Sequence, residues 1–427
     1  MTPNPAIMRS VEQLGYRVTV GDVATQIGLN IAEVNQSLLA LAADAGGHLQ
    51  VAESGDVVYQ FPKNFRDIIR NKYLQIRLQE WWKKVWSVLF YLIRISFGIL
   101  LVTSIVLILV TITIIMNANS DRDNDNRSNN SRGFNFFFFP DLFWYFSPNH
   151  RDSYQERRRE RGENNEMNFF EAVFSFLFGD GDPNANLEER RWEEIGAVIS
   201  NNQGAVVAEQ IAPYLDDIGA KYQQEYEDYM LPVLVRFNGM PQVSSDGQIV
   251  YYFPELQVRA SKKQRRSISE YLHEFSWKFS SASSGQLMLS AGLGGVNFVG
   301  ALILGNLLKN GTIATQIGGL VAFVQGIYGL LLAYGIGFLA IPLIRYFWIK
   351  RRNDQVSTRN LQRQERARLL AGADDSLQKK IDFAREFATE KVIGKEDSVY
   401  STEADLLEQE FQNKQIGNRE QGTGNRE

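Results

Sequence analysis

Three long stretches without a charged residue constrain this chain more than any other feature of its sequence. They cover residues 95–116, 285–308 and 312–344. An α-helix rises about 1.5 Å per residue, so each stretch is long enough to cross a hydrocarbon core about 30 Å thick. The last two stretches are separated by a short polar turn, which predicts a transmembrane hairpin. The sequence therefore predicts a multi-pass α-helical membrane protein.

Basic and aromatic side chains flank these stretches. The first stretch is preceded by cations and tryptophans: Lys72, Arg77, Lys83, Lys84, Arg94, Trp81, Trp82 and Trp86. Basic clusters also precede and follow the hairpin, at 262–266 and 345–352. Positively charged flanks remain on the cytoplasmic side of a membrane, and tryptophans favour its interface. We therefore expect both termini to be cytoplasmic, or on the equivalent side within a plastid.

One span followed by a hairpin leaves the region between them on the far side of the bilayer. The basic flanks of the hairpin would then face the wrong way, so the chain has to cross back. Only residues 133–150 are apolar and long enough to do so, although they contain Pro140 and Asp141. This segment is either a short fourth span or re-entrant element, or an aromatic segment at the membrane interface. The sequence leaves both alternatives open.

Four amide side chains of the hairpin are strongly polar: Gln286, Asn297, Gln316 and Gln325. An ion-coupled transporter normally has an ionisable residue at membrane depth, and none accompanies these amides. Hydrogen bonds between helices are therefore the favoured interpretation, and the many glycines of both arms predict close helix packing.

Two polar segments of the chain match each other without a gap. GGHLQVAESGDVVYQFP ends at Pro62, and NGMPQVSSDGQIVYYFP ends 192 residues later at Pro254. Agreement of this density indicates an internal repeat. Each copy is typical of two short strands joined by a turn that contains glycine.

The residues before the first hairpin show helical spacing in two segments, VTVGDVATQIG and NIAEVNQSLLALAADAG. Two helices followed by a two-stranded wing are the order of a winged helix. The second copy has VVAEQIAPYL and a longer linker helix, KYQQEYEDYM, before its hairpin. The predicted fold class is mainly α with small β wings, in a membrane protein that carries two winged-helix-like modules.

These patterns divide the chain into six regions. They are a first winged-helix-like module (1–66), a basic and aromatic flank with the first transmembrane helix (67–118), a polar loop with the aromatic segment and a linker (119–187), a second winged-helix-like module (188–258), a basic flank with the transmembrane hairpin (259–348), and a charged helical tail with a disordered end (349–427). The tail to about residue 393 is predicted to form an amphipathic helix at the membrane surface.

Winged helices often bind DNA, and the charge of the modules tests this possibility. The predicted second helix of the first module contains Glu33 and Asp44 and no basic residue. Residues 188–254 contain 11 acidic and 4 basic side chains. Because neutralising phosphates supplies most of the affinity for DNA, both modules should repel it. We therefore expect protein-binding or structural modules and no nucleic acid partner.

The sequence shows no enzyme active site. Cysteine is absent, and His48, His150 and His273 lie far apart, which excludes thiolate sites and argues against a histidine metal cluster. In FLFGDGDPN, Asp180 and Asp182 resemble the start of a calcium loop, but an acidic third ligand and the distal glutamate are missing. A turn that caps the next helix is favoured instead. We predict no catalytic, cofactor-binding or metal-binding residues.

The order of these features is similar to that of a family of cyanobacterial and plastid integral membrane proteins. FLFGDGDPN is the most specific match, and the second module ending in IVYYFP comes after it in the chain. The resemblance extends to about residue 395. Plant members are labelled iron–sulfur cluster biosynthesis proteins, but cluster scaffolding through thiolates does not transfer to a chain without cysteine. The resemblance implies a thylakoid or plasma membrane location.

Three functions are compatible with these observations. The leading hypothesis is a membrane-anchored scaffold or assembly factor that presents two acidic modules to another membrane protein complex. The second is a small-solute transporter or channel built on the glycine-rich hairpin. The third is a membrane-tethered transcriptional regulator. The expected partners are the lipid bilayer and a protein of a membrane complex.

Overall fold

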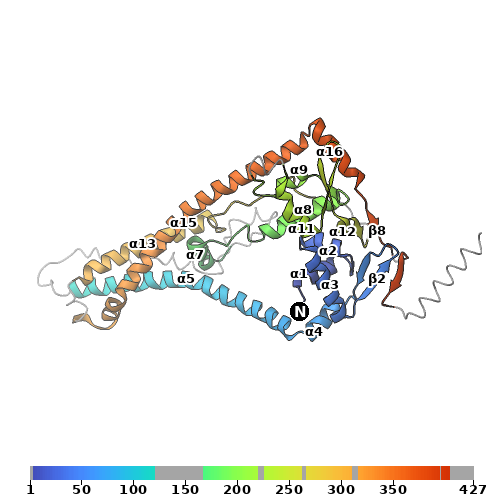
Figure 1. The fold of residues 1–427 in the computed structure, drawn as a ribbon. Helices are drawn as coiled ribbons and strands as arrows, with labels where there is room; N and C mark the ends of the chain where they lie inside the picture. The colour runs from blue at the N-terminus through green and yellow to red at the C-terminus, as the bar shows by residue number, and fades with distance from the viewer. Residues whose placement is uncertain are drawn as a thin grey trace, which may run out of the picture. The chain divides into compact units, whose positions relative to one another are not determined.

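The computed structural model describes residues 3–120, 167–219, 226–261, 266–309, 316–394 and 396–403. The fold is mostly helical and contains small, mainly antiparallel sheets. It divides into two compact units (Figure 1). We call them the helical unit (Trp82–Asp182 and Ser276–Asp354) and the module unit (Met1–Trp81, Pro183–Phe275 and Gln355–Glu427). The aromatic segment 133–150 and the end of the chain from residue 404 lie outside the described residues.

The helical unit is built on three long helices: α5 (Leu74–Ser120), α13 (Ser284–Leu308) and α15 (Gly319–Ala371). All three are long and apolar enough to cross a membrane, and they coincide with the three predicted stretches. A short apolar helix, α7 (Phe169–Phe178), packs beside α13. Helices α5 and α15 also contribute residues to the module unit.

Glycines bring the helices of this unit together at some positions and not at others. A Cβ atom at Gly294 would lie 2.4 Å from the ring of Phe338, so no larger residue fits there without a shift. A Cβ atom at Gly335 would lie 3.2 Å from the Cα of Phe298, which is a tight contact but a looser one than at Gly294. In contrast, Gly326 and Gly329 have open space around them within the described residues. The predicted close packing therefore uses part of the glycine stripe.

The first half of the module unit has seven elements: α1 (Pro5–Gln13), β1 (Arg17–Val18), α2 (Val20–Ile27), α3 (Ile31–Ala45), β2 (His48–Ala52), β3 (Val57–Gln60) and α4 (Phe65–Lys72). Thr19 and Asp22 form a reciprocal capping box that starts α2, and the Asn30 side chain caps α3. Gly28 and Gly46 end these helices with φ angles of 64° and 67°. The strands pair in the antiparallel order β1-β3-β2.

The second half repeats this order of elements with a more irregular middle. Its elements are α8 (Leu187–Asn201), β4 (Ala205–Val206), α9 (Ala208–Ile211), the 3₁₀ turns η1 (Ala212–Tyr214) and η2 (Asp228–Met230), α11 (Leu231–Phe237), β5 (Met240–Val243) and β6 (Ile249–Tyr252). The strands pair in the antiparallel order β4-β6-β5. The first half of the predicted linker helix, 221–225, lies outside the described residues, and its second half, 226–230, is a turn followed by η2 and not an α-helix.

The two hairpins have the same register. His48 pairs with Gln60 in the first half, and Met240 pairs with Tyr252 exactly 192 positions later in both strands. The buried side chains also correspond, in the pairs Leu38 and Met230, Leu41 and Val233, Tyr59 and Tyr251, and Phe61 and Phe253. The similarity between the two sequence segments is therefore also a similarity in strand pairing and burial.

The two halves share one hydrophobic core. Val34 and Leu38 of the first half belong to the same buried cluster as Ile195 and Phe237 of the second. At the contact, Arg236 donates from Nε to the carbonyl of Gly28 at 2.5 Å and stacks over Trp192, its guanidinium 4.3 Å from the ring centre. Burial of apolar surface is the main driving force of folding, so the halves form one body.

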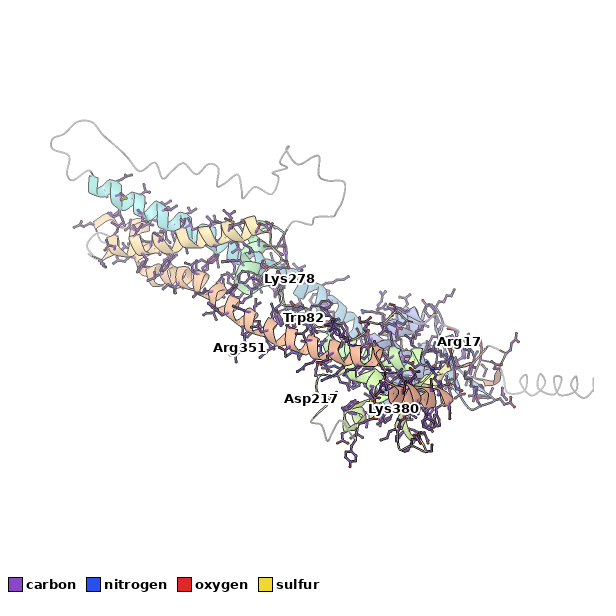
Figure 2. The ribbon with its side chains drawn as sticks, turned by 90° about the horizontal axis from the view of Figure 1, so that it is seen from above. Arg17, Trp82, Asp217, Lys278, Arg351 and Lys380 are labelled. Carbon is purple, nitrogen blue, oxygen red and sulfur yellow. The ribbon has the colours of Figure 1, made fainter. Side chains whose placement is uncertain are left out.

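The charged tail is part of this body, which corrects our expectation of a helix at the membrane surface. α16 (Asp375–Glu386) packs on β4 and β6, where Phe387 stacks on Tyr252. The short helix α12 (Pro254–Gln257) leads into β7 (Val258–Arg259), and β8 (Lys391–Val392) pairs in parallel with β7. Further along the tail, β9 (Ser398–Ser401) pairs with β2. Arg17 (Figure 2) donates to the carbonyls of Ala260 and Ile393 at 2.5 and 2.8 Å.

Replacing Gly28 by alanine tests the contact between the halves. A Cβ atom at Gly28 would lie 2.5 Å from the Cβ of Trp192. We expect Gly28→Ala to destabilise the full chain by about 3 kcal/mol, from the left-handed backbone and the collision together. Gly46→Ala is the matched control, because Gly46 ends α3 with nearly the same φ and nothing lies within 4 Å of its added Cβ. Thermal unfolding in detergent measures both, and equal losses would contradict the contact.

Candidate functional site

The end of α15 carries an arginine stripe that holds the second half of the module unit. Arg359, Arg363 and Arg366 follow at helical spacing. The side chain of Arg363 is 1% exposed and pairs with Glu274 at 2.7 Å and with Asp216. Arg359 binds Glu274 through two nitrogens, at 2.7 and 2.6 Å. The stripe thus fixes two carboxylates of a single acidic cluster.

The carboxylates of this cluster are held in their charged form. Burial opposes the charge of Glu274, but hydrogen bonds from Arg359 and Arg363 and their positive charges outweigh it. The pKa of Glu274 therefore lies below its ordinary value. The pKa of Asp216 is lowered for the same balance of reasons, with Arg363 and Arg191 supplying the opposing charge. The arrangement stabilises the fold and leaves no free acid or base for catalysis at these two carboxylates.

A second cluster joins the tail to the second half. Lys380 of α16, labelled in Figure 2, is buried and binds Glu209 at 2.8 Å and Glu227 at 2.5 Å. Glu227 also accepts a hydrogen bond from the hydroxyl of Tyr251 at 2.8 Å. The count of 11 acidic and 4 basic residues within 188–254 left out these cations because they come from the tail. The net acidity of the second half is therefore smaller in the fold than in its own sequence segment.

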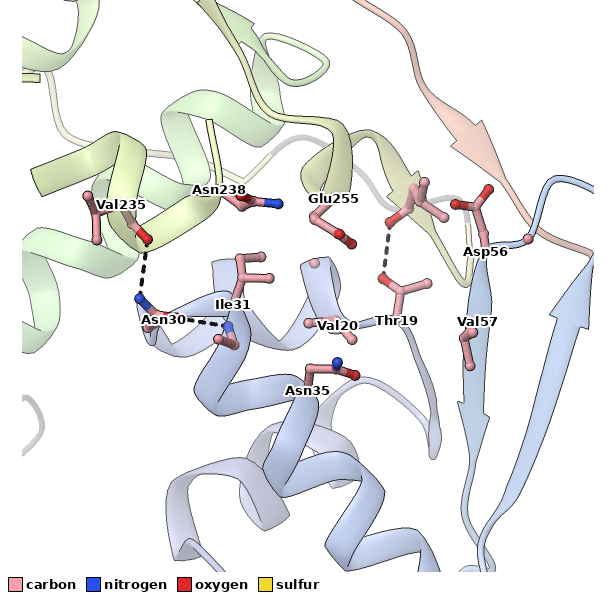
Figure 3. Close-up of a pocket in the computed structure, with 14 residues that line it drawn as sticks. Thr19, Val20, Asn30, Ile31, Asn35, Asp56, Val57, Val235, Asn238 and Glu255 are labelled. Atoms are coloured by element: carbon pink, nitrogen blue, oxygen red, sulfur yellow. Dashed lines mark hydrogen bonds between the residues drawn. The ribbon is translucent and has the colours of Figure 1, made fainter. Parts of the chain in front are cut away.

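The first turn of α3 faces the second half across a pocket of about 450 Å³ (Figure 3). Asn30 at the start of α3 donates to the carbonyl of Val235 in α11 at 3.2 Å, and Thr19 donates to the carbonyl of Val258 at 3.0 Å. Asp56 and Glu255 also line the pocket, and its lining contains no basic side chain. This composition does not suit a phosphate, which requires basic or N–H donors.

The outer face of α3 also has no basic side chain. Its exposed residues are Ala32, Glu33, Asn35, Gln36, Leu39 and Ala43. A DNA-reading helix needs cations that reach phosphates and donors that reach base edges. This face offers a carboxylate, two amides and small apolar side chains instead.

The FLFGDGDPN motif forms a clasp within the helical unit. Asp180 pairs with Arg94 of α5 at 2.6 Å and accepts hydrogen bonds from the Ser175 hydroxyl and the Ser281 amide, both at 2.7 Å. Gly179 has a φ of 80°, and a Cβ there would lie 2.5 Å from the guanidinium of Arg345. Arg345 in turn donates to the carbonyl of Phe176 at 3.0 Å. The motif is therefore occupied by structural contacts, and the adjacent arginines disfavour a cation at Asp180.

The polar residues of the hairpin have different surroundings. Asn297 of α13 is 1% exposed and accepts a hydrogen bond from Ser104 of α5 at 2.8 Å, as an interhelical contact requires. Gln286 belongs to the cap of α13 and donates to the carbonyl of Met167 at 2.6 Å. Gln316 and Gln325 are exposed on their helices. Among the described residues, no three histidine, aspartate or glutamate side chains are placed to hold a metal ion.

Known proteins place the chain in a family. It is 41% identical over 421 residues to a chloroplastic protein of Arabidopsis thaliana, uncharacterized protein At5g03900, and the match covers 95% of this chain and 80% of that protein. The chain belongs to the family of this chloroplastic protein. No family model matches, and no solved structure matches.

Membership in this chloroplastic family adds a location and no activity. The three candidate membrane helices and the chloroplastic relative together indicate association with a plastid membrane. The relative's name carries no iron–sulfur label. The sites described above are therefore interpreted from their own geometry.

The acidic cluster predicts how stability depends on pH. Because the pKa of Glu274 is lowered in the fold, its contribution is complete above the unfolded glutamate value of about 4.3 and is lost as pH falls through the lower folded value. Between about pH 5 and pH 3, the melting temperature of the unaltered chain should fall more than that of Glu274→Gln, whose side chain does not titrate. Thermal unfolding in detergent is the measurement.

Glu33→Gln controls for the loss of one charge, because it removes an exposed carboxylate of α3. Equal losses of melting temperature in the unaltered chain and in Glu274→Gln would contradict this role of the cluster.

Proposed function

We propose that the chain is a multi-pass plastid membrane protein that acts as a scaffold or assembly factor for another membrane protein complex. In this proposal its two halves are winged-helix-like modules that work as one protein-binding body. The observation that carries the proposal is the core that the two halves share, in which Asn30 joins the start of α3 to Val235, while the exposed face of α3 carries no basic side chain. DNA reading would need cations on that face.

The winged-helix assignment rests on the order and pairing of elements. Each half runs helix, strand, helix, helix, strand, strand, and in each half the first strand joins the hairpin beside its last strand. This is the arrangement of a helix-turn-helix followed by a wing. The repeat in register supports a common origin for the two halves.

Charge supports protein binding over DNA binding. The exposed face of α3 lacks cations, and the lining of the pocket beside it contains two carboxylates. Affinity for DNA falls steeply without Lys and Arg contacts to phosphate. A membrane-tethered regulator is therefore less well supported than a scaffold.

The second candidate, a transporter or channel on the hairpin, has less support from the helical unit. Asn297 and Ser104 use each other as hydrogen-bond partners between α13 and α5. Asp180 is paired with Arg94. Transport pathways keep ionisable groups available to solute or solvent, and these groups serve the packing of helices. Solute flux in liposomes remains the direct test of this alternative.

The shared core also bears on topology. Modules that share a core lie on the same side of a bilayer, so the chain has to cross back after α5. The described residues on either side of the undescribed segment 121–166 lie near opposite ends of α13. Gln286 at the start of α13 binds Met167, whereas Ile115, near the end of α5, packs with Leu308 at the other end of α13. The segment 133–150, for which the sequence leaves a crossing open, lies outside the described residues.

Protease tags in the two wing turns test this topology. Gly55 and Gly247 are equivalent positions of the repeat, and both have open space around them. Cleavage sites inserted at each should be cut equally when sealed plastid membrane vesicles of one orientation are treated with protease. A site protected at one position and cut at the other would place the modules on opposite sides and overturn the shared core.

The size of the native assembly tests the scaffold. The chain in plastid membranes, solubilised in a mild detergent, should migrate in native electrophoresis as a larger species than the purified chain in the same detergent. The difference is expected because a scaffold remains bound to its partner complex. Migration of both samples at one size would reject the proposal.

A further inference from the structure

The outer edges of the two equivalent sheets differ in whether a further strand covers them. In the first half, β9 covers the outer edge of β2, with Val51 opposite Tyr400 and the Thr402 amide donating to the carbonyl of Leu49 at 3.0 Å. In the second half, β5 occupies the position of β2 and pairs with β6 alone among the described residues. An uncovered edge of this kind presents backbone groups to any extended segment nearby.

The register identifies the backbone groups at the outer edge of β5. The amide of Ser244 donates to the carbonyl of Gln248, and that of Phe253 donates to the carbonyl of Gly204, the residue before β4. Backbone groups alternate in direction along a strand, so Gln242 and Ser244 face β6. The N–H and C=O of Val243 and the C=O of Pro241 therefore face outward. Their equivalents in the first half, Val51 and Leu49, are the residues that β9 covers.

Exposed apolar side chains accompany this edge. The side chains of Val243 and Met240 on β5 are 62% and 44% exposed. Exposed apolar side chains on an edge strand are typical of an interaction surface. We call these two residues and the outer edge of β5 the β5 surface.

We propose that the β5 surface binds an extended segment of a partner protein, which adds to β5 as an antiparallel strand in the way that β9 adds to β2. This inference rests on the proposed scaffold function and names its docking site. The segment gains main-chain hydrogen bonds from Val243 and Pro241 and apolar contacts from the exposed side chains. In this orientation the residues before its strand lie beside the wing turn, where the exposed Asp246 favours a basic residue.

Pro241 weakens pairing with a second copy of this chain. In a symmetric pair of β5 strands centred on Gln242, Pro241 lies opposite Val243 of the other copy, and both ends of this pairing need the missing N–H of proline. Half of the main-chain hydrogen bonds at those positions would be absent. A different strand can pair in the register that uses only the proline carbonyl.

Replacing Val243 separates backbone pairing from side-chain docking. Val243→Pro removes the outward N–H, which β6 does not use, whereas Val243→Thr keeps the N–H and a branched side chain of similar size. We expect Val243→Pro to weaken assembly by about tenfold and Val243→Thr to leave it nearly unchanged, since one backbone hydrogen bond is lost only in the first. The readout is the fraction of full-length chain in the larger native species from plastid membranes.

Thermal unfolding in detergent establishes that both variants fold, and amide exchange at Val243 in the assembly supplies a second readout. Slower exchange in the assembly than in the purified chain supports strand addition. Equal assembly of both variants, with unchanged exchange, overturns the inference while the larger species still supports a scaffold. If exchange of the Val243 amide slows in the purified chain as its concentration rises, a second copy binds the β5 surface. That result would overturn a partner protein as the occupant. If the unaltered chain forms no larger species, the scaffold itself fails.

Discussion

The hydrophobic core shared by the two halves is the constraint on which the rest of the structure depends. It buries residues of α3 and α11 together, and Arg236 seals the contact by donating to the carbonyl of Gly28. Two consequences follow from it. The start of α3 is joined to the second half through Asn30, and both halves have to lie on one side of any membrane that α5 crosses.

Features that depend on local composition were predictable from the sequence. The three long apolar helices follow from stretches without charge, because their length alone matches a hydrocarbon core. The two hairpins follow from alternating residues around Gly55 and Gly247, whose φ values of 84° and 77° are the left-handed angles such turns require. The identical strand register of the two hairpins follows from the ungapped match between the two segments.

Features that depend on contacts between distant segments were not predictable in this way. A window from 188 to 254 counts Glu209 and Asp216 as acidic surface, but Lys380 and Arg363, more than 140 positions away, neutralise them. The tail was therefore misread as a membrane-surface helix. One signal was present, because Arg359, Arg363 and Arg366 share a helix face, and a stripe of cations on one face indicates a partner elsewhere in the chain.

One difference between the two copies accounts for the contact that Lys380 makes with the second half. The buried tyrosine of each hairpin donates to the residue 24 positions earlier, which is Asn35 in the first half and Glu227 in the second. An amide satisfies this hydrogen bond without a counter-ion, whereas a carboxylate that is largely buried requires one. Lys380 supplies that charge and brings α16 onto the face of the second sheet. The tail then continues to the first half, where β9 covers the edge of β2, so the same segment covers a face of the second sheet and an edge of the first. Among the described residues, the β5 edge has no strand of this kind.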